Sequence, residues 1–217
     1  MGDAGASAGG PGTGPPPVRL LCLNLFMMMP PLFPGTKKDV RIRQLLDRAA
    51  EFDVLCLQEV WSAYSRRVDV FIRDAADRGF CYHARSGAPR LSQLKLLDGG
   101  LLILSRFPID SSEFVAYSTS AHADMVASKG ALYAQLRLGD RSLHIFNTHM
   151  QAFYAMVDPK ATAAKAIQLQ ELARFVLRRA SSDKEPVLLC GGETLPSHRP
   201  TGHNLRTAPP LFPIFTT

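Results

Sequence analysis

Polar side chains stand at the points where several apolar stretches of the sequence stop. Asn24 follows one apolar run, Glu59 ends a second, Asn147 and His149 close a third, and Asp98 opens a turn of two glycines. A carboxylate beside an amide is a set of hard oxygen ligands suited to Mg²⁺, which proteins hold through one or two carboxylates together with substrate phosphate. A histidine can donate to a phosphoryl oxygen as charge grows on it, and an aspartate near a water can act as general base. Together these residue types predict hydrolysis of a phosphodiester.

Each of these residues also has a simpler structural interpretation. Asn24 can start a turn, and Glu59 can be a solvated strand end. His149 can be a hydrogen-bonded core histidine, and Asp98 before glycine is a common turn signal. Taken one at a time, these interpretations stay open. Their occurrence together, in this order, favours a shared site at one edge of a sandwich.

The stretches between these residues alternate between strand and helix patterns. We predict strands at 18–24, 53–59, 81–85, 100–105, 114–117, 131–138, 142–148 and 187–190, and helices at 36–50, 63–77 and 161–179. Val40 in the first helix and Leu169 in the last are among the side chains predicted to face the core. Adjacent strands with short links favour antiparallel pairing, with helices on the outer faces. The predicted fold class is therefore α/β, a layered sandwich rather than a doubly wound parallel sheet.

The composition is that of a globular protein with a basic surface. The 217 residues are 46% hydrophobic and 20% charged, with a formal net charge of +6. This balance favours an anionic partner such as nucleic acid, a phosphorylated ligand or an acidic membrane surface, although modest basicity is also common without one. No apolar run approaches the roughly 18–20 residues needed to span a bilayer. We therefore expect a cytoplasmic or peripheral membrane protein.

Three segments are predicted along the chain. Residues 1–17 form a Gly/Pro-rich leader that cannot bury enough apolar surface to offset the entropy of ordering, so it is expected to be disordered. Residues 18–191 carry the alternating pattern of one domain. Residues 192–217 contain several prolines and little periodicity, so we expect an irregular tail.

Five motifs carry a resemblance to a known family. They are LCLN at 21–24, LQEVW at 57–61, DGGLLILSRFPI at 98–109, SKGALYAQL at 128–136 and FNTHMQA at 146–152. Their order and spacing resemble the endonuclease/exonuclease/phosphatase superfamily, and EVW with THMQA is similar to its Mg²⁺-dependent neutral sphingomyelinases. The resemblance covers residues 18–191. It implies a deoxyribonuclease-I-like fold, a four-layer α/β sandwich, and hydrolysis of sphingomyelin to ceramide and phosphocholine with Mg²⁺, or alternatively Mn²⁺.

The resemblance also implies roles for three pairs of residues. One pair holds the metal, one acts on the phosphoryl group and one contacts the substrate. In that order the pairs are Glu59 and Asn24, His149 and Asn147, and Lys129 and Lys165. Glu59 is expected to be the principal metal ligand, and His149 is expected to stabilise the charge that develops on the phosphoryl group.

An apolar loop, LFMMMPPLFP, follows the first predicted strand at 25–34. A sphingomyelinase must reach a lipid, so Phe26, Met28 and Phe33 are candidates for membrane contact, with Lys37 and Lys38 beside anionic head groups. Alternatively, the loop packs under the neighbouring helix. The expected partner is sphingomyelin or another phospholipid in a membrane surface, and nucleic acid is a weaker alternative.

The resemblance stops where the last predicted strand ends. The superfamily continues there with Gly-Asp-x-Asn, but aligning VLLCG puts Gly192 at the Asp position and Thr194 at the Asn position. A shift of one residue would put Glu193 at the Asp position. The Asp-His pair that supplies the general base in the superfamily is also missing downstream.

These absences predict a domain that is incomplete at its C-terminus, with exposed sheet edges. Because a general base contributes about 10²–10⁴ in rate, the chain itself is expected to be weak or inactive. The alternatives are a nuclease or other phosphoesterase of the same superfamily, and a non-catalytic fragment that binds a membrane or a protein.

Overall fold

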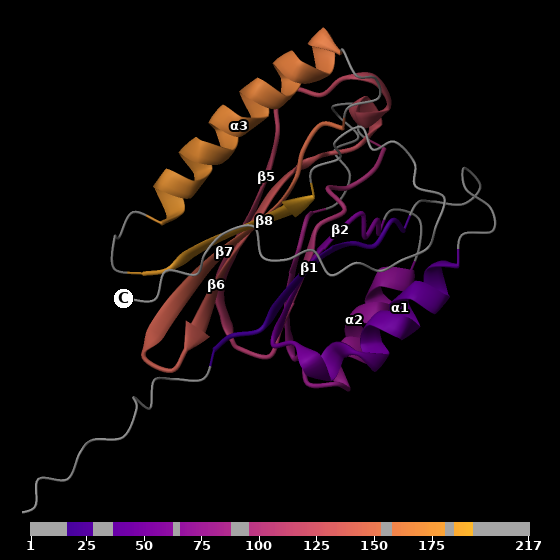
Figure 1. Ribbon diagram of the computed structural model, residues 1–217, viewed down its shortest axis with the longest axis vertical. Helices are drawn as coiled ribbons and strands as arrows, with labels where there is room; N and C mark the ends of the chain where they lie inside the picture. The colour runs from indigo at the N-terminus through magenta and orange to yellow at the C-terminus, as the bar shows by residue number, and fades with distance from the viewer. Residues whose placement is uncertain are drawn as a thin grey trace, which may run out of the picture.

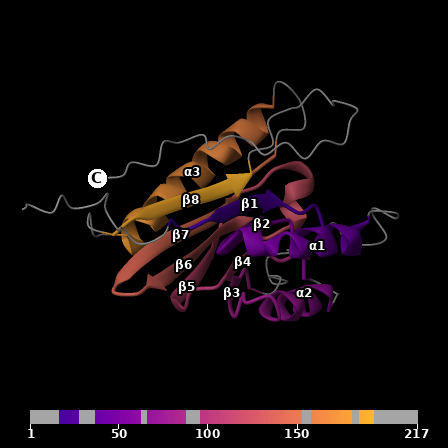
Figure 2. The same ribbon diagram turned by 60° about the horizontal axis from the view of Figure 1, so that its bottom comes forward.

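Two four-stranded sheets lie face to face between helices, which gives four layers (Figures 1 and 2). The computed structural model describes residues 17–27, 37–62, 66–87, 96–152, 158–180 and 185–192. The first sheet contains, in spatial order, β1 (Leu20–Asn24), β2 (Val54–Gln58), β4 (Leu102–Ser105) and β3 (Tyr82–Arg85). The second contains β5 (Ile109–Ala116), β6 (Gly130–Leu138), β7 (Arg141–His149) and β8 (Val187–Gly192). The predicted α/β sandwich is confirmed.

Helices form the two outer layers. α1 (Lys38–Asp47) and α2 (Arg67–Ala76) cover the first sheet, and α3 (Pro159–Arg179) covers the second (Figure 2). The Asp158 side chain caps α3 by accepting a hydrogen bond from the Ala161 amide, and Pro159 at the first helical position is pre-set for helical φ. Two short 3₁₀ helices complete the described elements, η1 (Ala49–Glu51) and η3 (His122–Val126).

Side chains that alternate along the strands build a separate core on each side of a sheet. The core between the two sheets is formed by buried side chains from six strands, which include Val54, Cys56, Ala84, Ile103, Leu132, Ile145 and Cys190. The opposite faces of β2 and β7 pack against the helices. This period-two alternation fixes which strand residues face each layer, because a slip of one residue would turn every side chain to the other face.

Two strand pairs are parallel, and each has a helix in its crossover. β1 pairs with β2 across α1, and β7 pairs with β8 across α3, while the other pairings are antiparallel. Two neighbouring parallel strands need such a crossover, because the chain must run from the end of the first strand back to the level at which that strand began. As a result β1 and β2 end side by side, and so do β7 and β8.

Two helix side chains predicted to face the core are exposed instead. Val40 lies two residues before buried Ile42, which places it on the opposite side of α1. Leu169 follows Gln168, and it is the glutamine that is fully buried and faces the sheet. These two predictions were wrong because each step along an α-helix turns the side-chain direction by about 100°, so a neighbouring residue can occupy the buried face.

Among the described residues, β8 is the last strand of the second sheet. Its Val187, Leu188 and Leu189 side chains are exposed. β8 lies beside β1, the edge strand of the first sheet (Figure 2). The predicted leader before Pro17, the loop residues Met28 and Phe33 and the tail after Gly192 lie outside the described residues.

Candidate functional site

The ends of four strands bring the predicted site residues together. Asn24 ends β1 beside the end of β2, and Glu59 is the next residue after β2. His149 ends β7 in the other sheet, in register with Gly192 at the end of β8. Glu59 Oε1 lies 3.8 Å from His149 Nε2, so the two sheets meet at these side chains. The prediction that strand ends build one site is consistent with this arrangement.

Glu59 is held in a sharp turn. Its backbone φ is 55°, in the left-handed region that residues other than glycine seldom adopt. The turn is fixed on both sides, because the Glu59 carbonyl accepts from the Met27 amide at 2.9 Å and the Val60 amide donates to the Gly100 carbonyl at 2.9 Å. Strain of this kind persists where the surroundings over-determine it, which is common at functional sites.

The Glu59 carboxylate is oriented by Asn24. Asn24 Nδ2 donates to Glu59 Oε1 at 2.8 Å, and Asn24 Oδ1 accepts from the Phe26 amide at 2.9 Å. Glu59 Oε2 is buried and has no hydrogen-bond partner. Burial raises the pKa of Glu59 above its ordinary value, because the charged form loses water. The arrangement leaves one carboxylate oxygen unpartnered, which is the group a metal ion would take.

His149 is buried beside this carboxylate. Burial, reinforced by the nearby Lys129 ammonium, lowers the pKa of His149 to about 3. The imidazole is therefore neutral at physiological pH. Its Nδ1 atom is buried and has no partner. A neutral imidazole with an unpartnered nitrogen is suited to donating a hydrogen bond to an incoming anion.

Asn147 faces the interior between the sheets. Its Oδ1 accepts from Gln58 Nε2 at 2.7 Å, and its Nδ2 donates to the carbonyls of Leu57 at 3.0 Å and Leu102 at 3.3 Å. The side chain is fully buried, and both ends of the amide are engaged with the first sheet. Asn147 is thus placed to fix β7 against β2, which sets the spacing between His149 and Glu59.

Lys129 precedes β6 and is buried. Its Nζ atom lies 2.9 Å from Asp124 Oδ2 and donates to the Met150 carbonyl at 2.9 Å. Asp124 Oδ2 also accepts from the Ala152 amide at 3.0 Å. The ammonium is therefore anchored to the segment that follows His149. Sequence reasoning missed Asp124, although a buried lysine requires a carboxylate and Asp124 is the nearest one before it in the chain.

Lys165 lies on the buried face of α3, one turn before Gln168. Gln168 accepts from the Gln151 amide at 2.8 Å and donates to the Thr119 carbonyl at 2.8 Å. This face of the helix therefore supports the chain just after His149. A substrate contact by Lys165 stays a prediction.

Asp98 stabilises a turn, which is the simpler of the two interpretations that its place in the sequence allowed. Its carboxylate accepts from the Gly100 amide at 2.9 Å and from the Ser62 amide at 2.9 Å, and it also accepts from the Ser62 hydroxyl. The side chain is buried. Asp98 thus ties the turn before β4 to the segment after Glu59.

Phe26 is exposed next to Asn24. Its φ is 49°, and its side chain is 43% exposed. Arg41 Nη2 donates to the Phe26 carbonyl at 2.6 Å, and the guanidinium lies 5.8 Å from the ring centroid. An aromatic ring is therefore held outward at the rim of the site, two residues after β1 ends at Asn24.

Buried polar atoms without partners gather at these strand ends. Folded proteins leave few such atoms, so each one requires an explanation. In the described part of the chain they include Gln58 Oε1, Glu59 Oε2, Trp61 Nε1, Ser128 Oγ and His149 Nδ1. All five belong to residues at or beside the meeting strand ends. An unpaired buried group costs about 1–3 kcal/mol, which a bound ligand would relieve.

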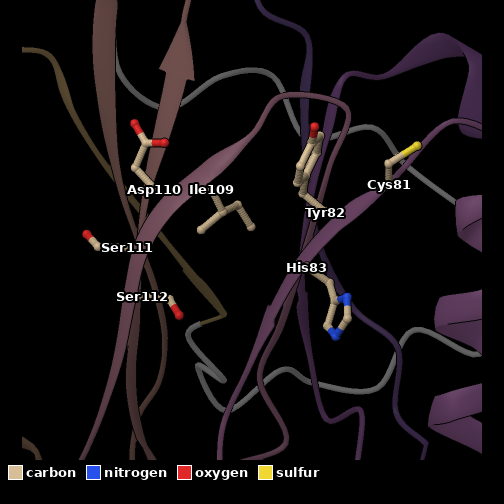
Figure 3. Close-up of a pocket in the computed structure, with 7 residues that line it drawn as sticks. All are labelled: Cys81, Tyr82, His83, Ile109, Asp110, Ser111 and Ser112. Atoms are coloured by element: carbon tan, nitrogen blue, oxygen red, sulfur yellow. The ribbon is translucent and has the colours of Figure 1, made fainter.

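A separate pocket of about 400 Å³ lies between β3 and β5 (Figure 3). Its lining residues are Cys81, Tyr82, His83, Ile109, Asp110, Ser111 and Ser112. Asp110 is paired with Arg137 at 2.9 Å, and the Ser111 hydroxyl donates to Gln135 at 3.2 Å. None of the strand-end residues lines this pocket, so it is distinct from the candidate site.

Comparison with known proteins is consistent with this geometry. Residues 21–191 match the Endonuclease/Exonuclease/phosphatase family. The chain is 34% identical over 168 residues to a sphingomyelinase of Dictyostelium discoideum, which covers 65% of this chain and 37% of that protein. The solved sphingomyelinase C of Streptomyces griseocarneus is similar with a TM-score of 0.72 at 25% identity, over 85% of this chain and 66% of that one.

A beta toxin of Staphylococcus aureus, solved with bound magnesium ions, shares the fold with a TM-score of 0.71 at 19% identity, over 84% of this chain and 67% of the toxin. The chain thus spans little more than a third of the Dictyostelium protein and about two thirds of the solved structures.

Proposed function

Because the chain belongs to the endonuclease/exonuclease/phosphatase family, we propose that it is the part of a magnesium-dependent sphingomyelin phosphodiesterase that holds the metal and faces the phosphoryl group. The observation that carries this proposal is the meeting of Glu59 and His149 across the two sheets, each with a buried polar atom that lacks a partner. The sphingomyelinases among its relatives support the choice of substrate.

The residues present fit a magnesium ion. Glu59 Oε2 is an unpartnered carboxylate oxygen, and Asn24 orients the same carboxylate through Oε1. Within the described ranges no group of three or more His, Cys, Asp or Glu side chains is placed to hold a metal. The single oriented carboxylate is itself the kind of ligand that Mg²⁺ takes, since this ion keeps several waters and binds through one or two carboxylates and substrate phosphate; Mn²⁺ accepts the same oxygen ligands. When bound, the ion would neutralise charge on the phosphodiester.

His149 would act on the phosphoryl group itself. The neutral imidazole donates to a non-bridging phosphoryl oxygen as negative charge develops there. The hydrogen bond between Gln58 and Asn147 ties β7 to β2 and so sets the spacing between the imidazole and Glu59, and the Lys129–Asp124 pair fixes the segment that follows His149. In the proposed reaction water attacks phosphorus and loses a proton, the bond from phosphorus to the ceramide oxygen breaks, and that oxygen takes up a proton, so that phosphocholine and ceramide are released.

One assay tests the substrate class. We expect Mg²⁺-dependent release of phosphocholine from sphingomyelin vesicles to be slow with this chain, because Gly192 supplies no carboxylate at the end of β8. A chimera that replaces the sequence after Gly191 with the matching part of the Streptomyces griseocarneus enzyme is expected to turn over sphingomyelin and to lose activity in EDTA. Cleavage of plasmid DNA by the folded chimera, with sphingomyelin untouched, would favour the nuclease alternative.

The membrane surface is the proposed place of action. Replacing Phe26 by serine is expected to weaken co-sedimentation with sphingomyelin vesicles several-fold, because an exposed aromatic ring at the rim of the site gains by insertion into the interface. The matched control is Leu177→Ser, which removes an exposed apolar side chain near the far end of α3. Equal binding by Phe26→Ser and the unmodified chain would show that Phe26 does not contact the membrane.

No helix in the described ranges has the length and apolar character to cross a membrane.

A further inference from the structure

The chain has one tryptophan, Trp61, and it stands two residues after Glu59. The indole is 6% exposed and packs with Leu97 and Ala127. Its ring centroid lies 6.4 Å from that of His149, with the two rings tilted by 46°. Trp61 therefore forms the wall beside the imidazole.

The position of the indole is set by Gly100. This glycine has a φ of 61°, and a Cβ added there would lie 2.8–3.0 Å from Cε3, Cζ3 and Cδ2 of the indole. The six-membered ring of the indole thus packs directly against the backbone of Gly100, where a side chain would leave no room for it. Because Nε1 is on the other side of the indole from Cε3 and Cζ3, the N–H group points away from this support.

The indole N–H has no hydrogen-bond partner. A buried tryptophan usually finds one, since its N–H is a strong donor with no acceptor function to offset it. Two polar atoms of the neighbouring site residues, Glu59 Oε2 and His149 Nδ1, are also buried and unpartnered. A donor left unpaired beside a carboxylate and an imidazole that are also unpaired indicates a shared ligand.

We propose that the Trp61 indole N–H is a substrate-contacting donor that binds a non-bridging oxygen of the phosphoryl group. This rests on the proposed function, because it adds a residue to the same site. The ligand class is a phosphate ester or free phosphate, which both present such an oxygen. Trp61 would add a second neutral donor to the one that His149 supplies, while the Lys129 ammonium is engaged by Asp124 and the Met150 carbonyl.

The single indole makes the proposal directly measurable. In a nitrogen-15 correlation spectrum the chain gives one indole N–H peak. With Mg²⁺ present, we expect this peak to move saturably with phosphocholine and with inorganic phosphate, and to stay in place with choline chloride. A peak that moves with choline and not with phosphate would overturn the assignment to the phosphoryl group.

The same spectra separate this proposal from the proposed function. If backbone amides of Glu59 and His149 shift with phosphocholine while the indole peak stays, Trp61 is not a contact and the site stands. If no resonance of the site shifts, both the proposed function and the inference about Trp61 are contradicted.

A pair of variants tests the hydrogen bond itself. Trp61→Phe keeps an aromatic ring and removes the N–H, so the dissociation constant for phosphocholine measured by calorimetry is expected to rise about tenfold. Tyr133→Phe is the matched control, because it removes a buried donor on β6 that pairs with His144 at 2.8 Å rather than with the site. An unchanged dissociation constant in Trp61→Phe, or an equal rise in Tyr133→Phe, would contradict the proposal.

Discussion

Replacing Glu59 by glutamine is expected to lower Mg²⁺-dependent release of phosphocholine by about 10³-fold, in this chain and in the chimera. Glu59 Oε2 is the unpartnered carboxylate oxygen of the site, and an amide in its place carries no charge to hold the ion. Calorimetric titration with Mg²⁺ is expected to show the matching loss of affinity. The same substitution is expected to make the folded protein more stable. Burial raises the pKa of Glu59, so the charged form is disfavoured in the folded state at neutral pH, and removing the charge should raise the free energy of unfolding.

Glu113→Gln is the control for this substitution. Glu113 lies on β5 and pairs with Arg178 at 2.8 Å and Arg179 at 2.7 Å, so it has the same chemistry outside the site. Its variant should keep both turnover and Mg²⁺ affinity. Wild-type Mg²⁺ affinity in Glu59→Gln would show that another group holds the metal.

Replacing Gly192 by aspartate is expected to raise phosphocholine release by this chain about tenfold or more. Gly192 is in register with His149 across the parallel β7–β8 pair, and side chains of register partners lie on the same face of a sheet. The new carboxylate would therefore lie beside the imidazole, at the position where the family resemblance places an aspartate. There it can orient the imidazole or a water.

Gly192→Asn separates charge from size in this experiment. The asparagine side chain fills the same space without a carboxylate, so it should give little increase. Gly191 must remain glycine in both variants, since a Cβ there would lie 2.8 Å from Thr148 Cγ2 and 2.9 Å from the Thr148 carbonyl oxygen. Equal rates in the aspartate and asparagine variants would show that a carboxylate at this point does not assist hydrolysis.

The strand ends could be predicted from the sequence because apolar runs stop abruptly at polar residues. Asn24, Glu59 and His149 each follow such a run, and the parallel order of β1 with β2 and of β7 with β8 brings the runs to one edge. The helices were recognisable from their period, although Val40 and Leu169 show that a neighbouring position on the helix can be chosen wrongly.

The partners of the site residues could not be predicted from the sequence. The three hydrogen bonds of the Asn147 side chain depend on the docking of two sheets, which no local pattern records. The same holds for the contact between Trp61 and His149, since the tryptophan looks like an ordinary core residue in a motif. Asp124 was missed for a different reason, because its 3₁₀ helix has too few residues to show a period.

The hydrogen bond between Gln58 and Asn147 also bears on when the site can form during synthesis. The two residues are 89 positions apart, so the bond cannot form until β7 has been made and has docked on the first sheet. Contacts between such distant positions form slowly, because a long loop must close first. A nascent chain that has not yet made β7 therefore has Glu59 without His149. The two halves of the candidate site come together only when the second sheet docks on the first.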